Sequence, residues 1–314
     1  MSSLIEQATQ RLAQLRQAGI VVDDLVPQHA HLDAAAAAPA RPIAPAVEPV
    51  PPRPVVTSKR VDLDFEALEG IGVVTPRAPR SRIADQYRVV KRPLIRNAMA
   101  KGSSAIAHGN LIMVTSALAG EGKSFTSLNL AISIAAELDH TVMLVDADVA
   151  RPSILPMLGL PPSRGLLDVL EDSADLSSVL LKTNIDKLTI LPSGTAHPRA
   201  TELLASDAMR NLLNDIATRY QDRIVIFDSP PLLLTTEARV LATHMGQVVI
   251  VIHAEKTLQS DVQSALATIE SCPVRLMLLN RALSDSRGAY GYGYGYGYGY
   301  GYGYGRKPDK QVVA

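Results

Sequence analysis

Cysteine is almost absent from this chain of 314 residues, because Cys272 is the only one. A single cysteine excludes an internal disulfide and a cysteine-based zinc cluster, and it is typical of a reducing compartment. A charge excess is also absent, since 31 basic residues balance 31 acidic ones. The sequence therefore predicts no broad cationic surface, and we expect no nucleic acid partner.

Long apolar runs are missing as well. No stretch approaches the length that crosses a bilayer. The N-terminus lacks a basic segment followed by an apolar core, so no signal peptide is expected. These absences predict a soluble, cytoplasmic protein. Apolar residues nevertheless make up 47% of the chain, which is enough for a real core, and the length allows one or two domains.

The stretch at 110–138 organises the rest of the sequence. An apolar run at 111–114 precedes Ala117-Leu118-Ala119-Gly120-Glu121-Gly122-Lys123-Ser124, and a helical pattern continues to Leu138. The spacing is that of a phosphate-binding P-loop, although an alanine stands where the first glycine is usual. Strand, glycine-containing loop and helix together predict a nucleotide site.

Each part of this loop has an expected role. Gly120 and Gly122 allow backbone N–H groups to face phosphate oxygens, and the start of the helix adds its positive dipole end. Lys123 should reach the β- and γ-phosphates, and the Ser124 hydroxyl should bind Mg²⁺. The predicted cofactors are therefore ATP and Mg²⁺.

Apolar runs alternate with helical patterns through the rest of the chain. We expect strands at 141–145, 188–191, 224–227, 248–252 and 274–279, and helices at 81–92, 200–220 and 257–271. Pro93 should stop or kink the first of these helices. The alternation predicts an α/β P-loop NTPase fold with a mostly parallel sheet covered by helices on both faces. Ligands then bind at the carboxyl edge of the sheet.

The composition divides the chain into four parts: a short amphipathic helix at 1–20, an Ala/Pro-rich linker at 21–62, a P-loop domain at 63–285, and a flexible Tyr/Gly-rich tail at 286–314. The linker holds seven prolines between Pro39 and Pro54, which favours extended conformations over a core. In the tail, glycine at every second position weakens a strand.

Three aspartates follow predicted strands: Asp146, Asp148 and Asp228. A single aspartate in such a place is usually a turn former or a helix cap. Three of them on the P-loop edge favour metal binding and catalysis. We expect Asp228 to act on Mg²⁺ through a water, Asp148 to belong to the same metal site with Ser124, and Asp146 to be the base. The predicted catalytic residues are these aspartates and Lys123.

The tail offers an acceptor for phosphoryl transfer. Its tyrosines alternate strictly with glycine and are Tyr290, Tyr292, Tyr294, Tyr296, Tyr298, Tyr300, Tyr302 and Tyr304. Ten residues after Asn280 span about 33–36 Å when extended, so the tyrosines can reach the nucleotide edge. A phenol with a pKa near 10 needs a positioned carboxylate to react at neutral pH. Alone, the tail would suggest a disordered, self-associating end. Attached to a P-loop domain, it favours the substrate interpretation.

These motifs carry a family resemblance. Ser116–Ser124, Val142–Pro152, Ile224–Pro231 and the tyrosine tail resemble the bacterial tyrosine kinases, whose Walker A, A′ and B motifs serve autophosphorylation of a C-terminal tyrosine cluster. The resemblance covers about residues 81 to 305. Within the family the chain is similar to the exosortase-associated tyrosine autokinases of exopolysaccharide synthesis and export, a branch that Leu191-Pro192-Ser193-Gly194 and Thr201-Glu202-Leu203-Leu204 also fit.

The resemblance implies further site residues and partners. Asn280 would contact adenine, and the full predicted nucleotide-binding set is Gly120, Glu121, Gly122, Lys123, Ser124, Phe125 and Asn280. Asp85, Arg88 and Lys91 match the family's Glu-x-x-Arg-x-x-Arg oligomerisation helix with two conservative changes, which implies a ring-shaped homo-oligomer. Taken alone, the three residues suggest a solvated helix face. The implied partners are a membrane-embedded polysaccharide co-polymerase and a phosphotyrosine phosphatase, with recruitment to the inner face of the cytoplasmic membrane.

Two other functions compete with this one. A ParA/MinD-like partitioning ATPase would carry a lysine at the position of Leu118, which counts against it. A nucleotide-dependent scaffold would bind a membrane partner through the tail without phosphoryl transfer. The sequence also departs from the kinase pattern at Ala119, where proline is frequent, and at Ala150, where a basic residue is common.

Overall fold

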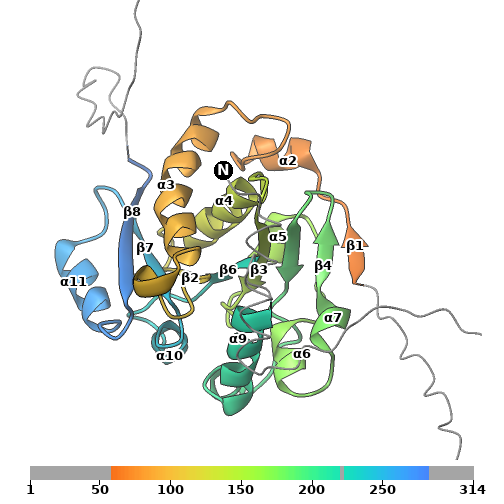
Figure 1. Cartoon of the computed structure of the whole chain (residues 1–314), viewed down its shortest axis with the longest axis vertical. Helices are drawn as coiled ribbons and strands as arrows, with labels where there is room; N and C mark the ends of the chain where they lie inside the picture. The colour runs from red at the N-terminus through yellow and green to blue at the C-terminus, as the bar shows by residue number, and fades with distance from the viewer. Residues whose placement is uncertain (1–57, 220–222, 283–314) are drawn as a thin grey trace, which may run out of the picture. The chain divides into compact units, whose positions relative to one another are not determined.

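The computed structural model describes residues 58–219 and 223–282. Within these ranges eight strands form one sheet in the order β1-β4-β5-β3-β6-β2-β7-β8 (Figure 1). The strands are β1 Lys59–Val61, β2 Leu111–Ser116, β3 Thr141–Asp146, β4 Leu181–Thr183, β5 Leu188–Leu191, β6 Arg223–Asp228, β7 Gln247–His253 and β8 Val274–Asn280. Neighbouring strands are parallel except β4 and β5. The prediction of a mostly parallel sheet is confirmed.

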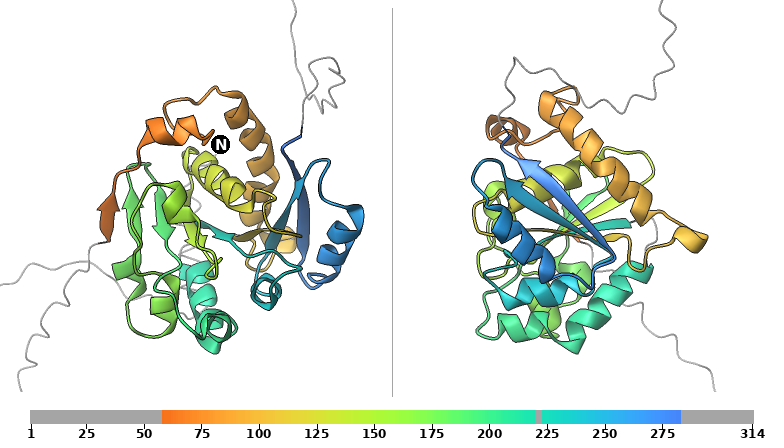
Figure 2. Two further views of the ribbon diagram at one scale, coloured as in Figure 1. Left: turned by 180° about the vertical axis from the view of Figure 1, so that it is seen from behind. Right: turned by 90° about the vertical axis from the view of Figure 1, so that its left-hand side faces the viewer.

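Helices cover both faces of this sheet. They are α2 Phe65–Gly70, α3 Arg82–Ala98, α4 Lys123–Ala135, α5 Ile154–Met157, α6 Leu166–Leu170, α7 Leu176–Val179, α8 Ala200–Leu204, α9 Asp207–Arg219, α10 Thr236–Ala242 and α11 Gln259–Ala267, with a 3₁₀ turn at Gly102–Ser104. Figure 2 shows α3 and α4 on one face and α9 and α10 on the other. Among the helices of the described ranges, none combines the length and the apolar character that crossing a bilayer needs.

The central strands carry unbroken runs of apolar residues because both of their faces are buried. In β2, Ile112 and Val114 pack in the core on the side of α3 and α4, whereas Leu111 and Met113 pack in the core on the side of α9 and α10. Successive side chains of a strand point to opposite faces, so a strand between two helical layers needs apolar residues throughout. This explains the unbroken apolar runs of the sequence.

The parallel register brings the strand ends to one edge. Asp146 at the end of β3 lies beside Asp228 at the end of β6. Asn280 at the end of β8 lies beside His253 at the end of β7. The loop between β2 and α4 leaves the sheet at the same edge, because β2 lies between β6 and β7. The predicted nucleotide edge is therefore present.

Several predicted helix boundaries were wrong. The helix α3 does not stop at Pro93 but continues to Ala98. A proline costs one backbone hydrogen bond, but Leu94 is only 1% exposed and packs in the core, and the Met99 N–H bonds the Ile95 carbonyl oxygen, so the last turns are retained.

The helix expected at 200–220 is two helices, α8 and α9, because the Ser206 hydroxyl accepts the Met209 N–H and caps a new start. The helix after the P-loop ends at Ala135, and Leu138 is exposed beyond it. The helix expected at 257–271 is shorter and spans Gln259–Ala267.

One domain boundary also changes. The strand β1 lies inside the range predicted as linker, 21–62, and pairs in parallel with β4. Three residues at the edge of a sheet carry too little periodicity to be recognised from the sequence. The predictions for 1–57 and for the tail lie outside the described residues.

Candidate functional site

Two glycines shape the loop between β2 and α4. Gly120 and Gly122 have φ values of 83° and 95°, in the left-handed region that glycine adopts without a steric penalty. At Gly122 a side chain is excluded for a second reason, because a Cβ atom would lie 2.1 Å from the Asn280 amide nitrogen. The helix α4 begins at Lys123, directly after Gly122, so its free N–H groups face the loop. The predicted P-loop geometry is thus present.

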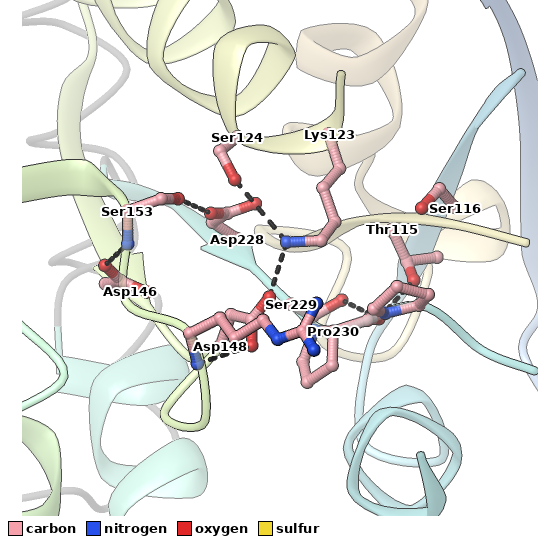
Figure 3. A network of polar contacts seen from close by, with 12 residues as sticks. Thr115, Ser116, Lys123, Ser124, Asp146, Asp148, Ser153, Asp228, Ser229 and Pro230 are labelled. Carbon is pink, nitrogen blue, oxygen red and sulfur yellow. Dashed lines mark hydrogen bonds and ion pairs between the residues drawn. The ribbon is translucent and has the colours of Figure 1, made fainter. Parts of the chain in front are cut away.

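Lys123 and Asp148 form an ion pair at the end of the sheet. The Lys123 Nζ atom donates a hydrogen bond to Asp148 Oδ2 over 2.6 Å. Both side chains are largely buried, with 12% and 6% exposed. Figure 3 shows the lysine pointing from the start of α4 across the loop toward Asp148. Asp148 therefore holds the Lys123 ammonium group beside the phosphate-binding loop.

Asp228 is fully buried beneath the start of α4. Its carboxylate accepts hydrogen bonds from the Ser127 hydroxyl over 3.2 Å and the Ser153 hydroxyl over 3.4 Å. Burial raises its pKa, while the nearby Lys123 ammonium and the hydrogen bond from Ser124 oppose that rise. Ser124 and Asp228 therefore converge, as predicted for a metal site.

Asp146 lies beside Asp228 in the sheet and is only 1% exposed. Its Oδ2 atom accepts the N–H groups of Ser153 and Ile154, each over 3.0 Å. Its Oδ1 atom has no hydrogen-bond partner in the described part of the chain. Burial, followed by the charge of Asp228, raises the Asp146 pKa from 3.8 to about 7. A carboxylate with this pKa and a free oxygen atom can accept a proton near neutral pH.

The donors present fit Mg²⁺ bound together with phosphates. Among the described residues no cluster of three acidic, histidine or cysteine side chains could hold a metal by itself. Mg²⁺ at phosphate-transfer sites needs only one or two carboxylates, because phosphates and waters supply the other ligands. The pair Ser124 and Asp228 matches this requirement, and the partnerless Asp146 oxygen shows unused acceptor capacity beside it. Asp148 is bonded to Lys123 instead, and its metal contact stays a prediction.

Five of the seven predicted nucleotide residues line two cavities. One of about 420 Å³ is lined by Gly120, Lys123, Ser124 and Asp148. A larger groove of about 800 Å³ is lined by Phe125 and Asn280, together with residues of α3. The first can hold phosphates and the second is wide enough for a larger group. The adenine contact of Asn280 stays a prediction.

Glu121 belongs to the predicted nucleotide-binding set, but its side chain is held inside the protein. Its side chain is only 4% exposed and turns away from both cavities, into hydrogen bonds with the Leu118 N–H group and the Thr257 hydroxyl. The carboxylate lines neither cavity, and the nucleotide contact of Glu121 stays a prediction. Only the Glu121 backbone belongs to the nucleotide loop.

The end of β8 lies against this loop. The Asn280 side-chain amide donates to the Glu121 carbonyl oxygen over 2.9 Å. The prediction that Asn280 shares an edge with Lys123 is confirmed. The described chain continues only to Ala282, so the predicted acceptors from Tyr290 to Tyr304 lie outside it.

The three residues predicted for an oligomer interface are not equivalent. Asp85 and Arg88 are exposed on α3 and form an ion pair with each other. Lys91 is only 4% exposed, and its ammonium bonds the Ser133 carbonyl oxygen over 2.6 Å and Glu137 over 2.7 Å. The expectation of a shared solvated face is wrong for Lys91, because at 3.6 residues per turn a residue six positions after Asp85 lies about 120° around the helix from it. Lys91 cannot contact another copy in this conformation.

Burial of Lys91 leads to a stability prediction. Lys91→Met should lower the free energy of unfolding by about 1–3 kcal/mol, because the buried Ser133 carbonyl loses its donor. The exposed Arg88→Met should change it by less than about 1 kcal/mol, as expected for a surface ion pair. Urea unfolding of both variants at low protein concentration measures the difference. Equal free energies of unfolding for the two variants would mean that Lys91 is not buried against Ser133 and lies on the surface.

The raised Asp146 pKa leads to a pH prediction. Because the native state binds this proton more tightly than the unfolded chain does, the contribution of Asp146 to stability is present at low pH. It is lost as the pH rises from about 4 to about 7. Asp146→Asn should therefore gain stability relative to the unmodified chain over this interval. Urea unfolding at pH 5, 6 and 7.5 in EDTA tests this, and parallel profiles of the two proteins would contradict it.

Two residues of the site, Ser153 and Thr257, were not predicted from the sequence. Ser153, whose N–H bonds Asp146 and whose hydroxyl bonds Asp228, lies one residue beyond the motif ending at Pro152. A longer motif would have included it. Thr257, which bonds Glu121, had no local signal, because its partner is 136 residues away in the sequence.

This chain is similar to a known domain family, to curated proteins and to solved structures. The AAA domain family model matches residues 109–283. Tyrosine-protein kinase YwqD of Bacillus subtilis is 30% identical over 221 residues, which cover 70% of this chain and 90% of that protein. Tyrosine-protein kinase CpsD of Streptococcus agalactiae is 29% identical over 185 residues, 58% of this chain and 78% of that protein. The kinase domain of Escherichia coli tyrosine kinase ETK superposes with a TM-score of 0.59 and 27% identity, covering 71% of this chain and 86% of that domain.

Proposed function

This chain belongs to the family of bacterial tyrosine-protein kinases, and we propose that it is an ATP-dependent autokinase that phosphorylates the tyrosines of its own tail. One observation carries the proposal. Asn280, the last residue of β8, bonds the phosphate-binding loop at Glu121, so the chain leaves the domain beside the nucleotide edge. The first tail tyrosine follows ten residues later in the sequence. The acceptor segment is thus attached next to the donor site.

The nucleotide is held by groups that the fold already orients. The backbone N–H groups of the loop at Gly120 and Gly122 cradle phosphate oxygens. The Lys123 ammonium, held by Asp148 over 2.6 Å, neutralises charge on the β- and γ-phosphates. Ser124 and Asp228 would hold Mg²⁺, which when bound would supply positive charge against the negative charge that develops on the transferred phosphoryl group. Phe125 and Asn280 line the groove for the remainder of the nucleotide, adenine included.

Asp146 is the proposed base for the acceptor tyrosine. A phenol loses its proton only near pH 10 in water. A carboxylate with a pKa of about 7 and a free Oδ1 atom can accept that proton as the hydroxyl oxygen bonds to the γ-phosphorus. The bond from the γ-phosphorus to the β–γ bridging oxygen breaks in the same transfer, and ADP leaves. The N–H groups of Ser153 and Ile154 fix the orientation of the carboxylate through Oδ2. The acceptors are the eight tail tyrosines, from the same chain or from a neighbouring copy.

The biological setting is proposed from the resemblance. We expect the kinase domain at 63–285, extended to include β1, and the tail at 286–314 to form the enzyme and its substrate. The family implies regulation of exopolysaccharide synthesis and export, a ring-shaped homo-oligomer, a membrane-embedded co-polymerase partner and a phosphotyrosine phosphatase. Recruitment to the inner face of the cytoplasmic membrane follows from that partner. Asp85 and Arg88 remain available on α3 for the oligomer contact.

The test is direct. Purified full-length protein is incubated with Mg-ATP, and phosphotyrosine is located by mass spectrometry. Phosphate on the tail supports the autokinase. Nucleotide binding or hydrolysis without phosphotyrosine would defeat it and favour a scaffold.

A further inference from the structure

The Glu121 carboxylate is buried in the phosphate-binding loop but lines neither nucleotide cavity. It is 4% exposed, and within 58–219 and 223–282 no lysine, arginine or histidine forms an ion pair with it. A buried charge without an ion pair is costly unless hydrogen bonds satisfy it. It also adds negative charge to a loop that is shaped for phosphates. A role other than ligand binding must account for it.

Its two oxygen atoms join two loops. Oε2 accepts the Leu118 N–H over 2.8 Å, which closes the phosphate-binding loop on itself. Oε1 accepts the hydroxyl of Thr257, which lies in the loop between β7 and α11. The same hydroxyl oxygen accepts the His253 N–H over 3.1 Å. The Thr257 hydroxyl therefore makes two hydrogen bonds, as an acceptor from His253 and as a donor to Glu121.

The main chain of Glu121 makes a third link. Its carbonyl oxygen accepts the Asn280 amide over 2.9 Å, and the Asn280 Oδ1 atom accepts the Arg281 N–H over 2.9 Å. Arg281 has a φ of 57°, a left-handed conformation that is unusual for a residue with a side chain. The direction in which the chain leaves β8 is thus fixed through Asn280 by the phosphate-binding loop. The Ala254 N–H bonds the Asn280 carbonyl oxygen over 2.9 Å and joins the β7–α11 loop to the end of β8.

We propose that Glu121 is a positioning residue that ties the phosphate-binding loop to the β7–α11 loop and to the end of β8. The affinity for nucleotide then depends on Thr257, a residue outside both nucleotide cavities. This inference rests on the nucleotide-binding part of the proposed function and not on tyrosine transfer. Without the Thr257 hydroxyl, the carboxylate loses one of its two partners and is freed toward the bound phosphates, which it repels.

The experiment measures binding of a fluorescent ADP analogue with Mg²⁺ to the full chain. Thr257→Val, which keeps the shape but removes the hydroxyl, is expected to raise the dissociation constant about tenfold, the effect of losing a hydrogen bond to a charged group. Thr257→Ser restores the hydroxyl and should bind within about twofold of the unmodified chain. Equal dissociation constants for Thr257→Val and the unmodified chain would overturn the inference.

A second measurement needs no variant, in case Thr257→Val does not fold. Because coupling is reciprocal, Mg-ADP should slow amide hydrogen exchange in the peptide 253–258 of the unmodified chain. Exchange there that nucleotide leaves unchanged would also overturn the inference. A chain that binds nucleotide, shows both effects and forms no phosphotyrosine would support this inference and defeat the proposed autokinase, so the two failures are distinguishable.

Discussion

Replacing Lys123 with methionine is expected to lower tail phosphorylation by about 10²–10³-fold, the loss found when one oriented charge-stabilising donor is removed from a transition state. The Lys123 side chain is 12% exposed and its ammonium group is held by Asp148, so little of its effect is screened by water. Methionine keeps most of the side-chain length but cannot neutralise the phosphates. The measurement is the initial rate of phosphotyrosine formation with saturating Mg-ATP.

The control for this variant is Lys182→Met, which removes an exposed lysine from β4, four strands from β2 in the sheet order. It should retain the full rate. Circular dichroism should show both variants folded. Persistent tail phosphorylation in Lys123→Met would mean that the phosphates bind elsewhere, and the autokinase mechanism would be abandoned.

Asp146→Asn is expected to lower the transfer rate by about 10²–10⁴-fold, the range for loss of a general base. Asparagine has the same shape, and its side-chain oxygen can still accept the N–H groups of Ser153 and Ile154. Nucleotide affinity should therefore stay within a few-fold of the unmodified chain. The two measurements together separate proton transfer from nucleotide binding.

Two comparisons sharpen this prediction. Asp139→Asn changes an exposed aspartate just before β3 and should leave the rate unchanged. Asp228→Asn, at the proposed metal site, should weaken Mg²⁺-dependent nucleotide binding as well as transfer. If Asp146→Asn transferred phosphate at the normal rate, Asp146 would not be the base, and its raised pKa would reflect burial alone.

Much of the site could be predicted because its signals are local. The left-handed glycines at 120 and 122, the lysine and serine that follow them, and the apolar run before them occupy one short stretch. The meeting of Asp146 with Asp228 required one further step, since parallel strands with short exits bring their ends to the same edge. The prediction that Asn280 would share this edge follows from the same rule and is confirmed.

The wrong predictions concern residues whose environment depends on contacts with parts of the chain that are distant in the sequence. The spacing of Lys91 suggests a solvated face, but Ser133 of α4 and Glu137, just beyond the end of α4, bond its ammonium group, and the lysine turns inward. Pro93 looked like a helix end, but burial of Leu94 favours continuation. Neither choice depends on neighbours in the sequence.

The sequence by itself determined the α/β architecture, the phosphate-binding loop and the acidic edge, because backbone conformation and strand burial depend on short runs of residues. Only the tertiary structure decided that the Glu121 carboxylate bonds Leu118 and Thr257. It also decided that Ser153 bonds both Asp146 and Asp228. Those contacts close across 136 and 75 residues of sequence. Their energies depend on which groups the fold brings within hydrogen-bond distance, and no local pattern carries that information.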